Sequence, residues 1–353
     1  MSSYYGYAGQ WLLSLSDIMG DHRITLAGDV QNDFQSTMHF FGSYLYMKKR
    51  IDFGGGAYYY KDYVGYGYSD VYYYDADLGG FFLASYPFSM FSRIDFEFVA
   101  RTINRSTRTY DNTDSLKETI NITLPSLSYS YDNILWGMTG PLNGMRAQAT
   151  VQVLPPIRSI ENPFVSCEID VRHYLHLFKR FVWANRVFLG ASQPISSAES
   201  PRRYLLGGSE NWLFTYSDIN YAQYENNVRY AFHTAMVVPF RGWRYFDLSG
   251  TRVAVLNSEF RFPFIKEVST VFPLPLAIRY VNGAVFTDLG NAWDRSDEQS
   301  GIPLPRKVFG GVGFGMRMDL GIFLLRYDRG WPVDVGAKSY GKPINYFSLG
   351  TEF

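Results

Sequence analysis

The sequence predicts an all-β protein: a transmembrane antiparallel β-barrel of the sixteen-stranded type, with about fifteen strands in this chain and a long outer loop folded inward. Three observations predict this fold. Apolar and polar residues alternate with a period of two along most of the chain. The alternating segments run to about ten residues, roughly twice the length of ordinary soluble strands. Aromatic residues make up 18% of the 353 residues, and Tyr outnumbers Trp by 29 to 7, as in the aromatic girdles of membrane barrels.

Each alternating strand carries an apolar face and a polar face. In residues 145–153 the apolar face is Met145, Ala147, Ala149, Val151 and Val153, and the polar face is Arg146, Gln148, Thr150 and Gln152. The strand at 92–101 gathers both basic and acidic residues on one face. Charges of both signs on one face suit a hydrated barrel lumen, with the apolar face toward lipid, better than the solvent face of a soluble sandwich.

The alternation also gives the order and direction of the strands. It places them near residues 9–17, 22–31, 35–47, 50–61, 72–87, 92–103, 118–130, 143–153, 164–175, 180–191, 250–262, 275–290, 307–319, 321–329 and 343–353. Short turns and longer polar loops tend to alternate between them, which is the pattern of periplasmic turns and outer loops. The first and last strands then both run toward the periplasm, so an antiparallel barrel closes only with one more strand. We therefore expect residues 1–353 to form a single barrel domain, with the missing strand, a signal peptide and a periplasmic region before Met1.

The last strand, within residues 343–353, shows the pattern clearly. Phe347, Leu349 and Phe353 share one face, and the opposite face carries small and polar residues, including Gly350. A terminal Phe resembles what bacterial outer-membrane barrels commonly present to their folding machinery. That resemblance implies a location in the bacterial outer membrane, with its lipid as a partner.

Composition excludes several classes of function. Lys plus Arg and Asp plus Glu both number 33, so there is no electrostatic basis for nucleic-acid binding. Cys167 is the only cysteine, which excludes an intrachain disulfide, and neither it nor the five histidines form a pattern that indicates a metal or cofactor. An outer-membrane lipase would need Ser, His and a carboxylate or amide together at one membrane edge, and no such arrangement is recognisable. We expect a protein that is not an enzyme and takes no cofactor.

A glycine-rich segment, Gly310–Gly315, resembles a phosphate-binding loop, but a strand pattern runs through it and no helix follows. We interpret these glycines as residues that relieve crowding or permit curvature in a barrel strand.

One connection, residues 192–249, is far longer than the others. It contains Leu206-Gly207-Gly208-Ser209 and then the short motif Arg241-Gly242-Trp243. Long loops without a fold of their own are usually functional or disordered. Because this loop is rich in aromatic residues and ends in a compact turn, we expect it to be ordered.

These motifs and the strands after them resemble the BamA/TamA-type outer-membrane assembly-factor superfamily, the bacterial surface antigen family. The strands are 250–263, which contains Glu259, and 283–293, which contains Phe286-Thr287-Asp288. The resemblance is strong over roughly residues 204–353 and compatible with the rest of the chain. It implies that Arg241, Gly242 and Trp243 form the tip of a loop that folds back into the barrel, where Phe286 and Asp288 receive the arginine.

The physical chemistry of these residues supports the same pairing. Glu259 and Asp288 lie on faces that we expect to look into the lumen, where two carboxylates are costly without a cation. Arg241, on a glycine-containing turn, can make a bidentate contact with a carboxylate and stack on an aromatic ring. We therefore expect a lumen clasp of Arg241 with Asp288, Phe286 and Glu259. The alternative is an ordinary loop arginine in water.

The resemblance implies that the chain acts in the insertion, assembly or translocation of proteins at the outer membrane. Its working part would be the seam between the first and last strands, where incomplete pairing leaves backbone groups available to a client strand. Phe347, Leu349, Gly350 and Phe353 would then form one side of the seam. The implied partners are client barrel strands, periplasmic modules and other envelope proteins.

The chain departs from the family pattern in two respects. An insert, Leu213–Val238, separates the two loop motifs, which normally lie close together. The periplasmic modules that deliver client chains in assembly factors are not within these residues, so client insertion does not follow from the resemblance alone. The alternatives are a barrel that anchors a periplasmic or surface domain, a subunit of a larger envelope complex, and a passive pore. A loop plug that carries Arg-Gly-Trp argues against the pore.

Overall fold

The computed structural model describes residues 7–32, 37–65, 71–109, 114–137, 139–156, 163–195, 202–210, 236–270, 276–299, 302–319 and 324–350. Within this part of the chain the regular elements are β-strands, apart from one short 3-10 turn, η1 (Arg295–Asp297). No helix among these residues is long and apolar enough to cross a membrane. The chain divides into two compact units: the first is Met1–Ser130, Thr150–Val165 and Pro194–Glu199, and the second is Tyr131–Ala149, Ser166–Gln193 and Ser200–Phe353.

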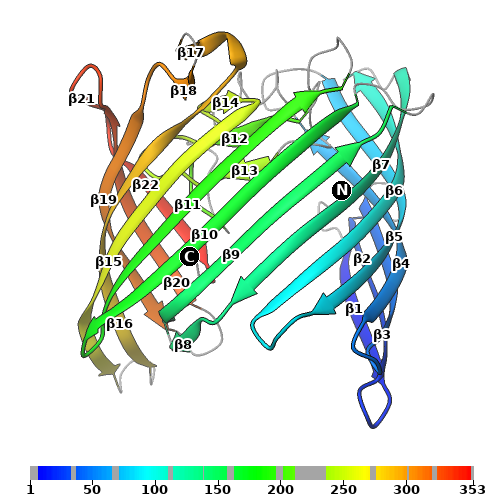
Figure 1. Ribbon diagram of the computed structural model, residues 1–353, viewed down its shortest axis with the longest axis horizontal. Helices are drawn as coiled ribbons and strands as arrows, with labels where there is room; N and C mark the ends of the chain where they lie inside the picture. The colour runs from blue at the N-terminus through cyan, green and yellow to red at the C-terminus, as the bar shows by residue number, and fades with distance from the viewer. Residues whose placement is uncertain are drawn as a thin grey trace, which may run out of the picture. The chain divides into compact units, whose positions relative to one another are not determined.

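The first unit is built from consecutive antiparallel strands, which Figure 1 shows as long ribbons running side by side. They are β1 (Tyr7–Ser16), β2 (His22–Asn32), β3 (Thr37–Tyr46), β4 (Asp52–Gly65), β5 (Val71–Pro87), β6 (Ser92–Thr109) and most of β7 (Asp114–Asp132). Each strand from β1 to β5 pairs antiparallel with the next one in the sequence. This meander of neighbours is the arrangement that hairpin connections produce.

The second unit continues the same architecture. Its strands are β8 (Leu135–Gly137), β9 (Gly140–Leu154), β10 (Phe164–Phe178), β11 (Phe181–Pro194), β15 (Arg252–Thr270), β16 (Leu276–Trp293), β19 (Phe309–Asp319), β20 (Leu324–Asp334), β21 (Ser339–Tyr340) and β22 (Ile344–Leu349), of which β9, β10 and β11 also give residues to the first unit. Strands β11, β15, β16, β19, β20 and β22 pair antiparallel in that order. Two further strands, β17 (Glu298–Gln299) and β18 (Ile302–Pro305), pair with each other.

The sequence predicts fifteen strands, and each corresponds to a strand of six or more residues in the described part of the chain. Several strands are longer than predicted. Strand β15 continues to Thr270. The pairing with β16 shifts register between Pro263 and Ile265, which accommodates a proline that has no N–H to donate to the ladder. The short elements β8, β12–β14, β17, β18 and β21 were not predicted, since two to four residues carry too little alternation to be recognised.

Burial in the second unit is inverted relative to that of a soluble protein. On one face the charged side chains are buried, with Glu259 1% exposed and Asp288 fully buried. On the other face the apolar side chains are exposed, with Val285 at 47% and Phe314 at 48%. We call the first the inner face and the second the outer face. A strand surrounded by lipid exposes apolar side chains and buries charged ones, whereas a strand facing water does the opposite. The burial in this unit matches the first case.

The long connection between β11 and β15 has a small sheet of its own. Strand β12 (Tyr204–Leu206) pairs parallel with β13 (Met236–Val238) and antiparallel with β14 (Leu248–Gly250). These strands form a hydrophobic cluster with inner-face residues of β11, β15 and β16, including Phe188, Val253, Val255 and Ala292. The loop is therefore ordered where it is described. Most of the predicted insert, Leu213–Val238, lies outside the described residues.

Candidate functional site

The two loop motifs contact each other although the insert separates them in sequence. The Gly208 N–H donates to the Trp243 carbonyl (3.1 Å), and the Phe240 N–H donates to the Gly208 carbonyl (3.0 Å). Glycine is required at Gly208 because its φ is +76° and a Cβ there would overlap the ring of Tyr245. The Gly-Gly-Ser segment and the Arg-Gly-Trp turn thus form one compact loop tip.

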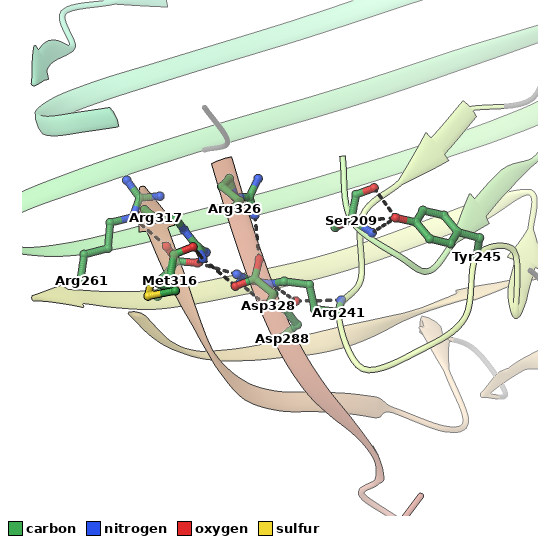
Figure 2. Close-up of polar contacts among 10 residues, drawn as sticks. Ser209, Arg241, Tyr245, Arg261, Asp288, Met316, Arg317, Arg326 and Asp328 are labelled. Atoms are coloured by element: carbon green, nitrogen blue, oxygen red, sulfur yellow. Dashed lines mark hydrogen bonds and ion pairs between the residues drawn. The ribbon is translucent and has the colours of Figure 1, made fainter. Parts of the chain in front are cut away.

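Arg241 reaches from this tip to the carboxylates of two neighbouring strands, as Figure 2 shows for Asp288. Its backbone N–H (3.0 Å), Nε (2.9 Å) and Nη2 (2.9 Å) all donate to Asp288, and Nη1 donates to Glu259. The guanidinium lies 3.8 Å from the centroid of the Phe286 ring. Arg241 is 1% exposed, so these contacts take place away from solvent.

The strand register explains why these partners lie together. Strands β15 and β16 pair with Glu259 opposite Phe286 and Asn257 opposite Asp288. Residues at such positions on one face of an antiparallel pair are close neighbours. We keep the name lumen clasp for Arg241 with Glu259, Phe286 and Asp288.

A second layer of ion pairs surrounds the lumen clasp (Figure 2). Glu259 also accepts from Arg261 Nε (2.8 Å) and Arg317 Nη2 (2.7 Å). Arg317 Nη1 and Arg326 Nη2 donate to Asp328, at 2.6 and 3.0 Å. The sequence did not single out Arg317, Arg326 and Asp328 as site residues. The signal that could have found them is their charge at inward positions of the predicted strands 307–319 and 321–329.

The glycines of β19 make room for this assembly. The odd-numbered Gly311, Gly313 and Gly315 lie at alternate positions of β19, on its inner face. A Cβ at Gly311 would overlap the Arg241 carbonyl, one at Gly313 would reach the Phe286 ring, and one at Gly315 would overlap the Asp328 carboxylate. Of the two interpretations of Gly310–Gly315, these contacts support relief of crowding, because Gly311, Gly313 and Gly315 leave room for the loop tip and its ion pairs.

The loop tip also bonds to the last strand. The Tyr346 hydroxyl of β22 accepts from the Gly242 N–H (2.9 Å) and donates to the Trp243 carbonyl (2.7 Å). The Trp243 indole N–H donates to the Gly310 carbonyl (2.7 Å). Tyr346 occupies the inner face of β22, opposite to Phe347 and Leu349 of the predicted seam residues.

The predicted residues of the last strand lie apart from the lumen clasp. Phe347 is exposed on the outer face, and Leu349 shares its side of the strand. Gly350 follows β22 with a φ of +92°, and its N–H donates to the Leu324 carbonyl (2.8 Å). Phe353 lies outside the described residues.

The site joins the loop tip to strands β15 and β16 through buried ion pairs. Burial alone would lower the pKa of Arg241, a loop residue, but the charges of Asp288 and Glu259 raise that pKa well above its ordinary value. The guanidinium therefore keeps its charge although it is buried. Among the described residues, no group of three or more His, Cys, Asp or Glu side chains could hold a metal ion.

The Tyr346 hydroxyl provides a direct test of how the loop tip holds β22. We expect Tyr346→Phe to lower the free energy of unfolding by about 1–3 kcal/mol, because a buried N–H and a buried carbonyl lose their partner. The measurement is urea unfolding of the folded protein in detergent. Tyr340→Phe is the matched control, since the Tyr340 side chain is exposed. Equal midpoints for the two variants would contradict the role assigned to the hydroxyl.

Comparisons with known proteins give the family match and the fold. The Omp85 superfamily domain matches residues 22–353. Among solved structures, BamA from Haemophilus ducreyi lacking POTRA domains 1–3 aligns with a TM-score of 0.67 at 13% identity, over 97% of this chain and 67% of that one. CdiB from Acinetobacter baumannii (TM-score 0.53, 12% identity) and CdiB from Escherichia coli (0.55, 12%) align over 97% of this chain. This chain spans 56% and 59% of the lengths of those two proteins. A search of curated proteins found no match. The structural matches show the fold, the antiparallel β-barrel predicted from the sequence.

Proposed function

The chain belongs to the Omp85 superfamily, and from that premise we propose that it is a bacterial outer-membrane β-barrel that acts in the insertion, assembly or translocation of proteins. The proposal includes no catalytic step and no cofactor. The partners it implies are outer-membrane lipid, other envelope proteins and the strands of client proteins. The inverted burial of the second unit supports the membrane location.

The observation that carries the proposal is the contact between the loop tip and the last strand. The tip bonds Glu259 of β15, Asp288 of β16 and Tyr346 of β22. A loop that bonds a strand close to the end of the chain can influence what that strand pairs with. A passive pore has no use for such a contact, and a buried loop tip on the inner face works against an open channel.

We place the working surface at the seam, on the side formed by β22, which pairs with β20 over the six residues Ile344–Leu349. A strand has two edges, and the second edge of β22 can offer backbone donors and acceptors to an incoming strand. In the proposal, client strands add at this seam while the loop tip steadies β22 through Tyr346.

A site-specific crosslinking experiment tests the seam. We expect a photoreactive amino acid in place of Phe347 to capture a radiolabelled outer-membrane barrel precursor on illumination. The comparison position is Phe314 on β19, which has a similarly exposed ring on the outer face but lies within the sheet, between β16 and β20. Equal capture at the two positions, or none at Phe347 in a folded protein, would count against the seam. A large and steady single-channel conductance would favour the pore.

A further inference from the structure

A cavity of about 230 Å³ lies at the end of the second unit where β10 turns into β11. Its lining includes Thr139, Leu142, Arg180, Val182, Arg261 and Asn282. Thr139 and Leu142 belong to the segment around β8 and the start of β9, and the other four belong to the strands β11, β15 and β16 and the turn before β11. The cavity is therefore lined both by the β8–β9 hairpin and by residues of β11, β15 and β16.

The β8–β9 hairpin, which lines the cavity, is held in place by two sets of contacts. The Asn282 side-chain N–H₂ donates to the Thr139 hydroxyl. Ile134 and Leu142 pack against the buried side chains of Tyr174, Val182 and Ala184. Strand β8 pairs with the start of β9, which closes the segment into a hairpin. The cavity walls are thus positioned by protein contacts that exist without a ligand.

Two guanidinium groups from different elements approach the cavity. Arg261 is 7% exposed, donates through Nε to Glu259 and lies with its guanidinium 6.0 Å from the Tyr174 ring centroid. Its Nη1 is directed toward the hairpin, since a Cβ built on Gly140 would lie 3.4 Å from it. Arg180 comes from the exposed turn between β10 and β11. None of the described residues that line the cavity is acidic.

The lining selects a chemical class of ligand. Arginine side chains favour oxyanions, which they can bind through paired N–H donors. The Asn282 amide and the Thr139 hydroxyl add neutral hydrogen-bonding groups. Leu142, Val182 and Pro141 add apolar surface to the same lining. Polar groups and apolar surface in one cavity suit a carboxylate attached to an apolar group.

We propose that this cavity is a binding site for a carboxylate that carries an apolar substituent, of about the size of one large amino-acid residue. Such a group occurs at the C-terminal end of a polypeptide and in free aryl or alkyl carboxylic acids. The site does not include the seam and does not depend on it. Arg180 is the group that an incoming carboxylate meets first, and Arg261 is the buried group that receives it.

The test is isothermal titration calorimetry on the full chain folded in detergent. The probes are N-acetyl-L-phenylalanine, its amide, and 3-phenylpropionate. We expect the two acids to bind and the amide, which lacks the carboxylate, to bind at least about tenfold more weakly. Binding of N-acetyl-L-phenylalanine alone assigns the site to peptide ends, and similar binding of both acids assigns it to carboxylates in general. Equal binding of the acid and its amide overturns the proposal.

Variants locate the binding to this cavity. Arg180→Gln should weaken binding of N-acetyl-L-phenylalanine by about tenfold or more. Lys179→Gln is the matched control, because Lys179 is an exposed basic residue of the same turn that does not line the cavity. Unchanged affinity of Arg180→Gln overturns the assignment, as does an equal loss in Lys179→Gln. Comparison of the acid with the amide on the unmodified protein decides the chemistry even if a variant folds poorly.

Discussion

Replacing Arg241 with alanine is expected to cost about 3–5 kcal/mol of folding free energy, the range for removing one partner of a buried ion pair. Arg241 makes three hydrogen bonds to the Asp288 carboxylate, which is fully buried. Glu259 would keep its bonds to Arg261 and Arg317. The loss therefore falls mainly on Asp288. Folded barrels resist SDS until heated, so we expect the variant to lose heat-modifiable migration on a gel or to lose it at a lower temperature.

Two further variants separate the lumen clasp from a general effect of the loop. Arg244→Ala changes an exposed arginine three residues away and should leave migration unchanged. Arg241→Ala combined with Asp288→Asn should recover part of the loss, because the orphaned carboxylate becomes neutral. Unchanged migration of Arg241→Ala would show that the lumen clasp does not support the fold. A double variant as unstable as the single one would show that Asp288 is not the group left unpaired.

A methyl group added at Gly311 of β19 is expected to displace the loop tip. In Gly311→Ala the new Cβ would overlap the backbone carbonyl of Arg241, which cannot move without breaking the contacts of the tip. We expect a loss of about 3 kcal/mol, the upper end of the range for overpacking. The displaced tip should also become open to trypsin at Arg241 and Arg244. Limited proteolysis in detergent, followed by mass spectrometry of the fragments, measures this.

The neighbouring glycine is the control for that change. A Cβ at Gly310 would face the end of the Leu289 side chain at 3.3 Å, and this flexible group can move aside. Gly310→Ala should therefore resist trypsin as the unmodified protein does. If both variants are cleaved equally, the effect belongs to the strand rather than to the tip. If neither is cleaved, Gly311 is not needed for docking of the tip.

The strands could be predicted because their signal is local. Alternation along a strand records which face meets lipid, and it is strong over the ten or more residues of most strands. Boundaries were less certain where another local factor intervenes, as at Pro263, where an irregularity in the ladder lets β15 continue. The hairpin at β8 was missed because its few residues pack on Tyr174 and Val182, which lie far ahead in the sequence.

The candidate site was only partly predictable. Arg241, Glu259 and Asp288 could be named because the Arg-Gly-Trp motif and the strands after it resemble a family pattern, and because carboxylates at inward positions need a counterion. The structure places the three side chains in contact. Their role in the cell stays a prediction. Tyr346 could not be named, since nothing local distinguishes it from the other 28 tyrosines. Gly311 could not be assigned its contact either, because a residue without a side chain gives no indication of what approaches it.

The loop tip contacts strands that lie far apart in the sequence, which limits when it can dock during folding. The tip contacts β15 and β16 through Arg241, β19 through Gly311, β20 through Gly330 and β22 through Tyr346. Tyr346 lies 104 residues beyond Gly242, so the tip can complete its contacts only after the last strand has arrived. A slip of β19 by one residue in one of the two directions would bring Val312 under the Arg241 carbonyl in place of Gly311 and block docking. Docking of the tip is therefore a late step that succeeds only on strands paired in the correct register, and it acts as a check that this half of the sheet is complete.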